Sequence, residues 1–259
     1  MNQTIHLIYF SPTGTTRKTV TAIAQGLGTG KVVHHDLTRV REGIELTLDE
    51  GVAVIGFPVY AGRVPELFLQ RIERLQGAGV PVIIAAVYGN RAFEDALLEM
   101  ADVCRAKGFS VSAAGAFIGE HSYATISQPV ALGRPDHDDL DRAVEFGTLA
   151  SRAAADPSRR EPQIPGAFPY KDRLPLGGAA PDTDEVLCTL CGACGEVCPT
   201  FVIEVGDAVR TNAAGCIKCC ACTRVCPAGA RTMNHPSVAE RRQMLVDNCS
   251  RRKKPEFFL

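Results

Sequence analysis

The stretch IHLIYFSPTGTT, residues 5–16, sets the architecture that we expect for the first half of the chain. It opens with a mostly apolar run, continues through a turn that contains proline, glycine and several hydroxyl side chains, and leads into a segment with helical periodicity. A short apolar run that ends in turn residues and is followed by a helix is typical of a βα unit. The stretch therefore predicts a strand over 5–10, a loop, and a helix that starts at residue 15.

The same alternation continues to about residue 155. Two of the later runs, VAVIGF and VPVIIAAV, contain no polar residue, which is typical of strands buried on both faces of a sheet. Five strands with interleaved helices predict an α/β domain over residues 1–155, built on a doubly wound, five-stranded parallel sheet. The expected strands are 5–10, 31–36, 52–57, 80–87 and 111–119, and the expected helices are 15–27, 65–75, 92–107 and 135–155.

The remainder of the chain differs from this pattern in composition. Residues 156–183 contain six prolines and no apolar period, so we expect an extended linker that can wrap over a surface. Residues 184–235 carry a cysteine repeat and are expected to form a second, small α+β domain. Residues 236–259 are expected to form a helix over 237–246 and a basic tail that ends in RRKKPEFFL.

Composition restricts the classes of function. Of the 259 residues, 46% are hydrophobic and 22% are charged, so the chain can bury a core. The net charge of -1 gives no general attraction to nucleic acid. The N-terminus lacks the pattern of a signal peptide, and no apolar stretch reaches the roughly 18 residues that a membrane span needs. We therefore expect a cytoplasmic protein, with no membrane span, whose thiols stay reduced.

Ten of the eleven cysteines follow residue 187. The pattern C-x2-C-x2-C-x3-C-P, which runs from Cys188 to Pro199, is repeated 28 residues later from Cys216 to Pro227. Zinc sites usually draw on two separated cysteine pairs, and disulfide frameworks distribute cysteines through small secreted domains. The observed spacing instead indicates two iron–sulfur clusters, because three cysteines of each repeat bind one cluster and the fourth reaches the other. Zinc and disulfides are the alternatives.

The cysteine repeat resembles a bacterial two-cluster ferredoxin over roughly residues 184–235. The resemblance implies two [4Fe–4S] clusters with ligands exchanged between the repeats. Cys220 lies between two of the implied ligands, and we interpret it either as a small filler residue or as a sign that the ligand assignment slips by one position. The implied ligands of one cluster are Cys188, Cys191, Cys194 and Cys226, and those of the other are Cys216, Cys219, Cys222 and Cys198.

The loop at 11–16 places hydroxyl side chains at the start of a helix, where free backbone amides and the helix dipole attract a phosphate. It resembles the FMN phosphate loop of flavodoxins, and this resemblance extends over residues 1 to about 155. Two further loops, at 57–65 and 88–95, follow strands at the edge where ligands of open α/β sheets bind. For Tyr60 and Tyr88, packing at a strand end is the alternative role. The resemblance implies that FMN contacts Ser11, Thr13, Gly14, Thr15 and Thr16 through its phosphate, and Pro58, Val59, Tyr60, Ala61, Gly62, Tyr88, Gly89, Asn90 and Arg91 around its ring.

The segment 119–136 is long for a loop between a strand and a helix, and long loops at this edge often bind ligands. His121 and Tyr123 within it either lie near the flavin or belong to an ordered loop that covers the cysteine domain or a second copy of the chain. The sequence singles out no catalytic residue.

The whole chain resembles the flavodoxin–ferredoxin fusion proteins of prokaryotes, many of them anaerobes. This resemblance implies a redox protein with FMN and two [4Fe–4S] clusters. We interpret it as an electron-transfer protein that works with a redox partner protein; the alternative is an oxidoreductase that reduces a small-molecule substrate at the flavin. A redox sensor that docks a partner through the basic tail is a third interpretation. A homodimer would bring the clusters of one chain near the flavin of the other, although no residue requires it.

Overall fold

The computed structural model describes residues 3–156, 158–174 and 178–259. Its larger part is a six-stranded sheet with strand order β12-β7-β6-β4-β1-β2, in which all neighbouring pairs except β12 and β7 are parallel. Without β12 this order is 2-1-3-4-5 along the chain, the flavodoxin-like variant of the doubly wound fold. The five parallel strands are β1 (Gln3–Tyr9), β2 (Gly30–Asp36), β4 (Val52–Pro58), β6 (Pro81–Tyr88) and β7 (Ser110–Ile118).

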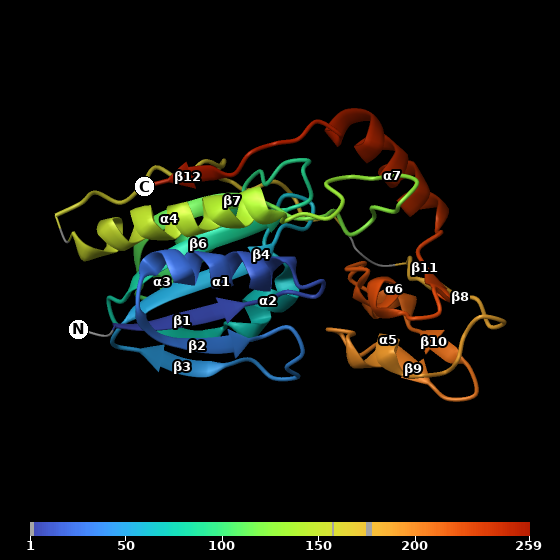
Figure 1. The fold of residues 1–259 in the computed structure, drawn as a ribbon. Coiled ribbons are helices and arrows are strands. Elements are labelled where there is room, and N and C mark those ends of the chain that lie inside the picture. Colours follow the sequence, from blue (N-terminus) through green and yellow to red (C-terminus); the bar gives the residue numbers. More distant parts are fainter. Residues whose placement is uncertain (1–2, 157, 175–177) are drawn as a thin grey trace.

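Helices cover both faces of this sheet (Figure 1). Helices α1 (Thr15–Leu27) and α4 (His137–Ala155) pack together on one face, and α2 (Glu66–Arg71) and α3 (Ala96–Ala106) pack on the other. The predicted five strands and four helices are therefore confirmed, with α2 and α3 shorter than expected. A small parallel pair that the sequence did not predict, β3 (Glu45–Leu48) with β5 (Arg74–Gly77), lies beside the main sheet.

The sixth strand comes from the C-terminal tail. Residues of β12 (Glu256–Phe258) pair antiparallel with β7. The ring of Phe257 lies 4.9 Å from that of Phe146 and 5.9 Å from that of Phe117, and Arg252 forms an ion pair with Asp136. The expected basic tail is thus part of the main sheet, and a three-residue strand is too short to be recognised as a periodic pattern.

The cysteine-rich domain repeats its conformation as well as its sequence. Its elements are β8 (Asp182–Thr183), α5 (Ala193–Glu196), β9 (Ile203–Val205), β10 (Val209–Thr211), the 3-10 turn η1 (Ala213–Gly215), α6 (Ala221–Val225) and β11 (Arg231–Thr232). Strand β8 pairs with β11, and β9 pairs with β10. Residues with positive φ also recur 28 positions apart, as Leu190 and Lys218, Gly192 and Cys220, and Phe201 and Gly229.

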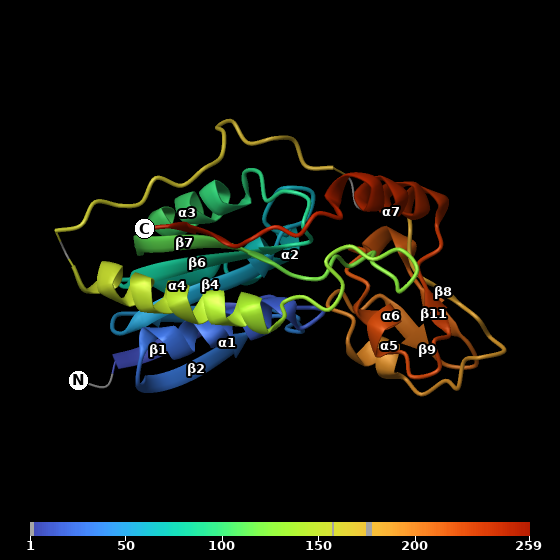
Figure 2. The same cartoon turned by 45° about the horizontal axis from the view of Figure 1, so that its top comes forward.

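Two segments tie this domain to the α/β domain (Figure 2). The described part of the linker runs along α3, where the Asp95 carboxylate accepts hydrogen bonds from the backbone amides of Ala167 and Lys171. Helix α7 (Pro236–Cys249) packs against the 119–136 loop, and Arg242 Nε donates to the Tyr123 carbonyl at 2.6 Å. Residues 157 and 175–177 of the expected linker lie outside the described residues. None of the helices in the described part of the chain has the length and apolar character that crossing a bilayer requires.

Candidate functional site

The loop between β1 and α1 has the geometry of an anion site. Gly14, with φ 82°, begins the helix in a left-handed conformation that favours glycine. The Ser11 hydroxyl accepts a hydrogen bond from the Arg17 amide at 3.0 Å, and the Ser11 amide donates to Thr38 Oγ1 at 2.8 Å. The first turn of α1 contains no acidic side chain, so the partial positive charge of its free amides is not neutralised there.

Thr16 supplies a second indication of a bound anion. Its side chain is fully buried, and its hydroxyl has no hydrogen-bond partner within the described residues. A buried polar group without a partner costs about 1–3 kcal/mol, so a partner is expected at this position. A phosphate oxygen at the start of α1 would provide it, and the residues present therefore fit the phosphate of FMN.

A cavity of about 60 Å³ lies beside the 11–16 loop. It is enclosed by three further strand-end loops, at 58–60, 87–89 and 119–122, and by Cys219 of the cysteine-rich domain. A second cavity, of about 320 Å³, shares four wall residues with the first and is also lined by Ala61 and Arg91. The predicted flavin contacts that line the smaller cavity are Ser11, Thr13, Thr15, Thr16, Pro58, Val59, Tyr60, Tyr88 and Gly89.

Three of the predicted flavin contacts line neither of these two cavities. Gly14 lines a shallower depression on the outer side of the phosphate loop. Gly62 has φ 84°, and a Cβ atom there would lie 1.7 Å from Glu94 Oε2, so this position requires glycine for the turn itself. The Asn90 side-chain amide donates to the carbonyls of Cys249 and Arg251, at 2.6 and 2.8 Å, and so anchors the C-terminal tail.

His121 lines both cavities, and the 119–136 loop also contacts the cysteine-rich domain through Arg224, which bonds the Glu120 carboxylate and the His121 carbonyl. The pKa of His121 is lowered to about 4, mainly by burial and in smaller part by the nearby charges of Arg91 and Arg224. Its Nδ1 accepts a hydrogen bond from the Tyr123 amide at 3.1 Å, which assigns the proton of the neutral ring to Nε2. Gly89 leaves room for this ring, because a Cβ atom there would lie 2.4 Å from it. The segment therefore covers part of the cysteine-rich domain and also lines the cavity beside the 11–16 loop, whereas its position near a flavin stays a prediction.

The tyrosines around the cavities are neutral phenols. Burial raises the pKa of Tyr88 to about 12, and the Glu256 carboxylate adds to this effect. Burial likewise raises the pKa of Tyr123 to about 12, and that of Tyr60 well above its ordinary value. These side chains can therefore donate hydrogen bonds but carry no negative charge at neutral pH.

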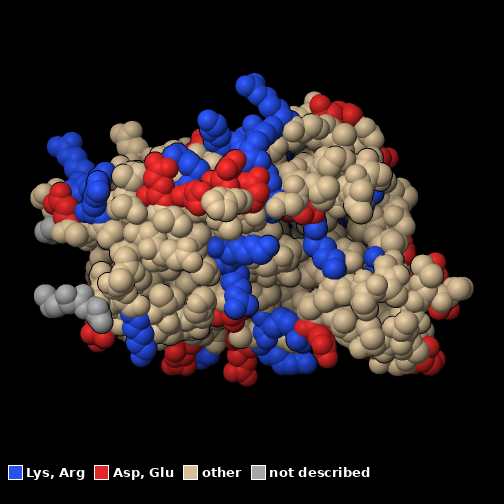
Figure 3. Space-filling view, in the orientation of Figure 1, with Lys and Arg blue, Asp and Glu red and all other residues tan. Residues whose placement is uncertain are grey.

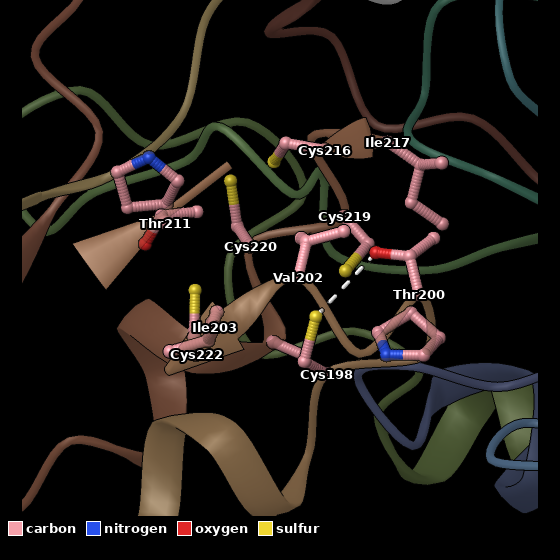
Figure 4. A pocket seen from close by; sticks show the side chains of 13 residues that line it. Cys198, Thr200, Val202, Ile203, Thr211, Cys216, Ile217, Cys219, Cys220 and Cys222 are labelled. Atoms are coloured by element: carbon pink, nitrogen blue, oxygen red, sulfur yellow. Dashed lines mark hydrogen bonds between the residues drawn. The ribbon is translucent and has the colours of Figure 1, made fainter. Parts of the chain in front are cut away.

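Four of the predicted cluster ligands surround one small cavity in the cysteine-rich domain. Cys198 from the first repeat joins Cys216, Cys219 and Cys222 from the second, and their sulfur atoms point toward a common space (Figure 4). Cys220 also lines this space, with φ 58° at the position that Gly192 occupies in the first repeat. Within the described residues, no three His, Cys, Asp or Glu side chains are grouped closely enough to hold a single metal ion.

The other predicted set is more exposed to solvent. It consists of Cys188, Cys191, Cys194 and Cys226. Cys194 is buried, Cys188 and Cys226 are half-buried, and Cys191 is exposed. The segment between β8 and α5, which carries the first two of these cysteines, lies on the side of the domain that faces away from the main sheet (Figures 1 and 2).

A buried arginine joins the two domains at Pro199, next to Cys198, and no sequence pattern indicated this contact. The guanidinium of Arg71 donates to the carbonyls of Leu37 and Thr38 and, at 2.6 Å, to the carbonyl of Pro199. Arg41 lies over the ring of Phe201, 4.4 Å from its centroid, on the same junction. These contacts hold the set formed by Cys198, Cys216, Cys219 and Cys222 against the α/β domain, on the side that carries the 11–16 loop.

Comparisons with known proteins find similarity in two parts of the chain. The family described as "4Fe-4S binding domain" matches residues 181–204. No curated protein sequence matches the chain. Solved structures with some similarity include a flavodoxin from the domain Archaea (15% identity, 59% of this chain and 99% of that chain, TM-score 0.41) and a short-chain flavodoxin associated with a bacterial microcompartment (15%, 59% and 99%, TM-score 0.43). A flavodoxin of Streptococcus pneumonia TIGR4 has 17% identity over 57% of this chain and 99% of its own, with a TM-score of 0.38.

These structural similarities are weak, and the fold rests on the strand order instead. The parallel order β2-β1-β4-β6-β7 is flavodoxin-like, and the matched family covers the first cysteine repeat. The chain therefore joins an α/β domain with flavodoxin-like strand order to a segment that matches a 4Fe–4S binding domain.

Proposed function

We propose that this protein transfers electrons between FMN and two [4Fe–4S] clusters held within one chain. The observation that carries the proposal is the position of Cys219. This cysteine lines the same cavity as the phosphate loop and the two strand-end tyrosines, and it also belongs to the four cysteines around the smaller cavity of the cysteine-rich domain. A ligand of one cluster would therefore form part of the wall of the flavin site.

The α/β domain contributes binding and orientation. The free amides of α1 and the unpaired hydroxyl of Thr16 bind the phosphate, and the loops that carry Tyr60 and Tyr88 enclose the ring. Neutral His121 presents an Nε2 proton as a hydrogen-bond donor at the same cavity. When bound, FMN exchanges one or two electrons, whereas each cluster exchanges one.

The cysteine-rich domain contributes ligands in two sets of four. The grouping of Cys198 with Cys216, Cys219 and Cys222 supports crossed ligation, because it takes one cysteine from the first repeat and three from the second. The recurrence of the same backbone conformation 28 residues apart supports a second, equivalent set formed by Cys188, Cys191, Cys194 and Cys226. The second set then lies further from the flavin site. A reducing compartment such as the cytoplasm suits this many unpaired thiols.

The outer set of cysteines suggests where a redox partner protein docks. Val186 is 94% exposed and Leu190 is 43% exposed, and they flank Cys188 and Cys191. Residues 182–198 contain four acidic and no basic side chains, and the outer edge of this domain shows red and tan surface in Figure 3. A partner with a basic rim around an apolar centre fits this surface, and its association should weaken as the salt concentration rises.

A second candidate function is the reduction of a small anionic substrate. The 320 Å³ cavity is lined by four basic side chains and by no acidic one, and its volume lies at the low end for ligand sites. The basic residues are Arg91, Lys171, Lys218 and Arg241. Glu94 pairs with Arg91 and Lys171, whereas within the described residues Lys218 and Arg241 have no carboxylate partner. These charges would favour an anion close to the flavin.

Rapid mixing of the anaerobic holoprotein with less than one equivalent of reductant tests the main proposal. Absorbance follows the flavin, and freeze-quench EPR follows the clusters. We expect electrons to redistribute between flavin and clusters at a rate that does not depend on protein concentration, because both lie in one molecule. A rate proportional to protein concentration, or a preparation that binds only one of the two cofactor types after reconstitution, would contradict the proposal.

A further inference from the structure

Arg231 is a buried cation at the centre of the cysteine-rich domain. Its side chain is 4% exposed, and it lies at the start of β11. The guanidinium donates to Thr183 Oγ1 at 2.6 Å and to Thr211 Oγ1 at 2.8 Å. These two threonines lie 28 residues apart, at equivalent positions of the two repeats, so the guanidinium is located where the two halves of the domain meet.

The charge of Arg231 is not balanced by a carboxylate. Within the part of the chain that the structure describes, no Asp or Glu oxygen lies within 4.0 Å of its nitrogens, and its Nε has no hydrogen-bond partner. The two threonine hydroxyls are neutral and supply no opposite charge. Burial of an unpaired cation is strongly unfavourable, so a negative group is expected beside it.

The sulfur atoms of both cysteine sets supply that group when they are bound to iron. Arg231 Nη2 lies 3.8 Å from Cys222 Sγ. Cys222 is the third cysteine of the second repeat. The two threonines that Arg231 bonds, Thr183 and Thr211, each lie five residues before the first cysteine of a repeat, so the guanidinium lies between the two cysteine sets. A cluster with four thiolate ligands carries net negative charge, so it pairs with the guanidinium.

We propose that Arg231 raises the reduction potential of both clusters, and most strongly that of the cluster bound by Cys222. The inference rests on the proposed function, because it requires both clusters to be present. Reduction adds one negative charge to a cluster, and a cation fixed nearby stabilises the reduced form. The equivalent position of the first repeat holds Ile203, so the domain contains one such cation. Its hydrogen bond to sulfur goes to Cys222, so we expect the larger rise in reduction potential for the cluster that Cys222 binds.

Three variants of the full chain test this inference by anaerobic redox titration with EPR detection. Arg231→Met removes the charge at similar length, Arg231→Lys keeps it, and Arg210→Met removes an exposed charge of the same domain that pairs with Asp207. For Arg231→Met we expect the ratio of reduced to oxidised Cys222-bound cluster, at a fixed potential, to fall at least tenfold, which is a shift of about 59 mV. The other cluster should shift less, Arg231→Lys should retain most of the wild-type potential, and Arg210→Met should match the wild type.

The possible results separate an electrostatic role of Arg231 from a purely structural one. Unchanged potentials in an Arg231→Met protein with full iron content would overturn the inference. Loss of iron from Arg231→Met but not from Arg231→Lys would support it, since the charge would then be needed to hold the anionic clusters. Loss of iron from both would show a structural role and overturn it. A wild-type protein without cluster signals would instead refute the proposed function on which the inference rests.

Discussion

The α/β domain and the cysteine-rich domain are stabilised by different interactions. In the first, helices bury both faces of the sheet, and the interior strands β4 and β6 are buried along almost their whole length. In the second, the strands have two or three residues, and many of the buried side chains are cysteines. Apolar burial can stabilise the first domain alone, whereas a domain this small usually needs metal ligation in addition. Loss of a cofactor should therefore affect the two domains differently.

The largest expected effect is the response to iron removal. When iron is removed from the holoprotein with a chelator and reductant, we expect residues 184–235 to lose their protection from hydrogen exchange, because ligand binding supplies much of the folding free energy of a small metal domain. The α/β domain should keep the protection of β4 and β6. Hydrogen exchange followed by mass spectrometry measures both regions in one sample. Persistent protection of 184–235 without iron would show that the difference between the domains is smaller than we infer.

The converse experiment removes FMN and leaves the clusters in place. Thr15→Asp introduces a carboxylate at the start of α1, where we expect it to repel the phosphate and weaken FMN binding at least 100-fold, or about 3 kcal/mol. Thr15→Ser is the matched control and should bind nearly as the wild type does. Flavin fluorescence measures the affinity, and iron content should stay unchanged. Full flavin retention in Thr15→Asp would refute the assignment of the phosphate loop.

The tail tests whether the α/β domain depends on a contact from the end of the chain. Phe257→Ala removes a half-buried ring that packs on Phe117 and Phe146, and we expect it to destabilise this domain by about 2 kcal/mol. Phe168→Ala, at a side chain that is 79% exposed, is the control and should cost less than about 0.5 kcal/mol. Urea denaturation followed by far-UV circular dichroism compares the two. Equal effects would mean that β12 contributes little. Because residues 256–258 belong to the sheet, a deletion of 250–259 would also damage the fold, so it would not isolate the sensor role considered for the tail.

The smallest expected effect concerns pH at the junction of the domains. The pKa of His121 is about 4 in the folded protein, below the value of about 6.5 of an exposed histidine. The unfolded chain therefore binds more protons below about pH 6.5, and stability is lost as the pH falls toward 4. Between pH 7.5 and 5.5 the loss is on the order of 1 kcal/mol. Exchange of the histidine C2 hydrogen, followed by mass spectrometry, gives the midpoint for this ring. A midpoint near 6.5 would contradict the buried, neutral state.

Much of the fold was predictable because its signals are local. The uninterrupted apolar runs of β4 and β6 identify interior strands, and the spacing of the cysteines within each repeat predicts iron ligands. The start of α1 after the 11–16 loop was predictable in the same way, and the binding of a phosphate there stays a prediction. The short strands β3 and β5 were missed because four residues show no clear period.

The sequence by itself determined the parallel sheet, the hydroxyl-rich loop at 11–16 and the repeated cysteine pattern, because each depends on residues that are neighbours along the chain. Only the tertiary structure decided that Cys219 lines the cavity beside this loop, that Asn90 anchors the tail, and that the guanidinium of Arg231 lies between the two repeats without a carboxylate partner in the described residues. These properties arise from contacts between segments far apart in sequence. Burial and charge pairing at such contacts depend on how the segments pack, and the pattern of a single segment does not contain that information.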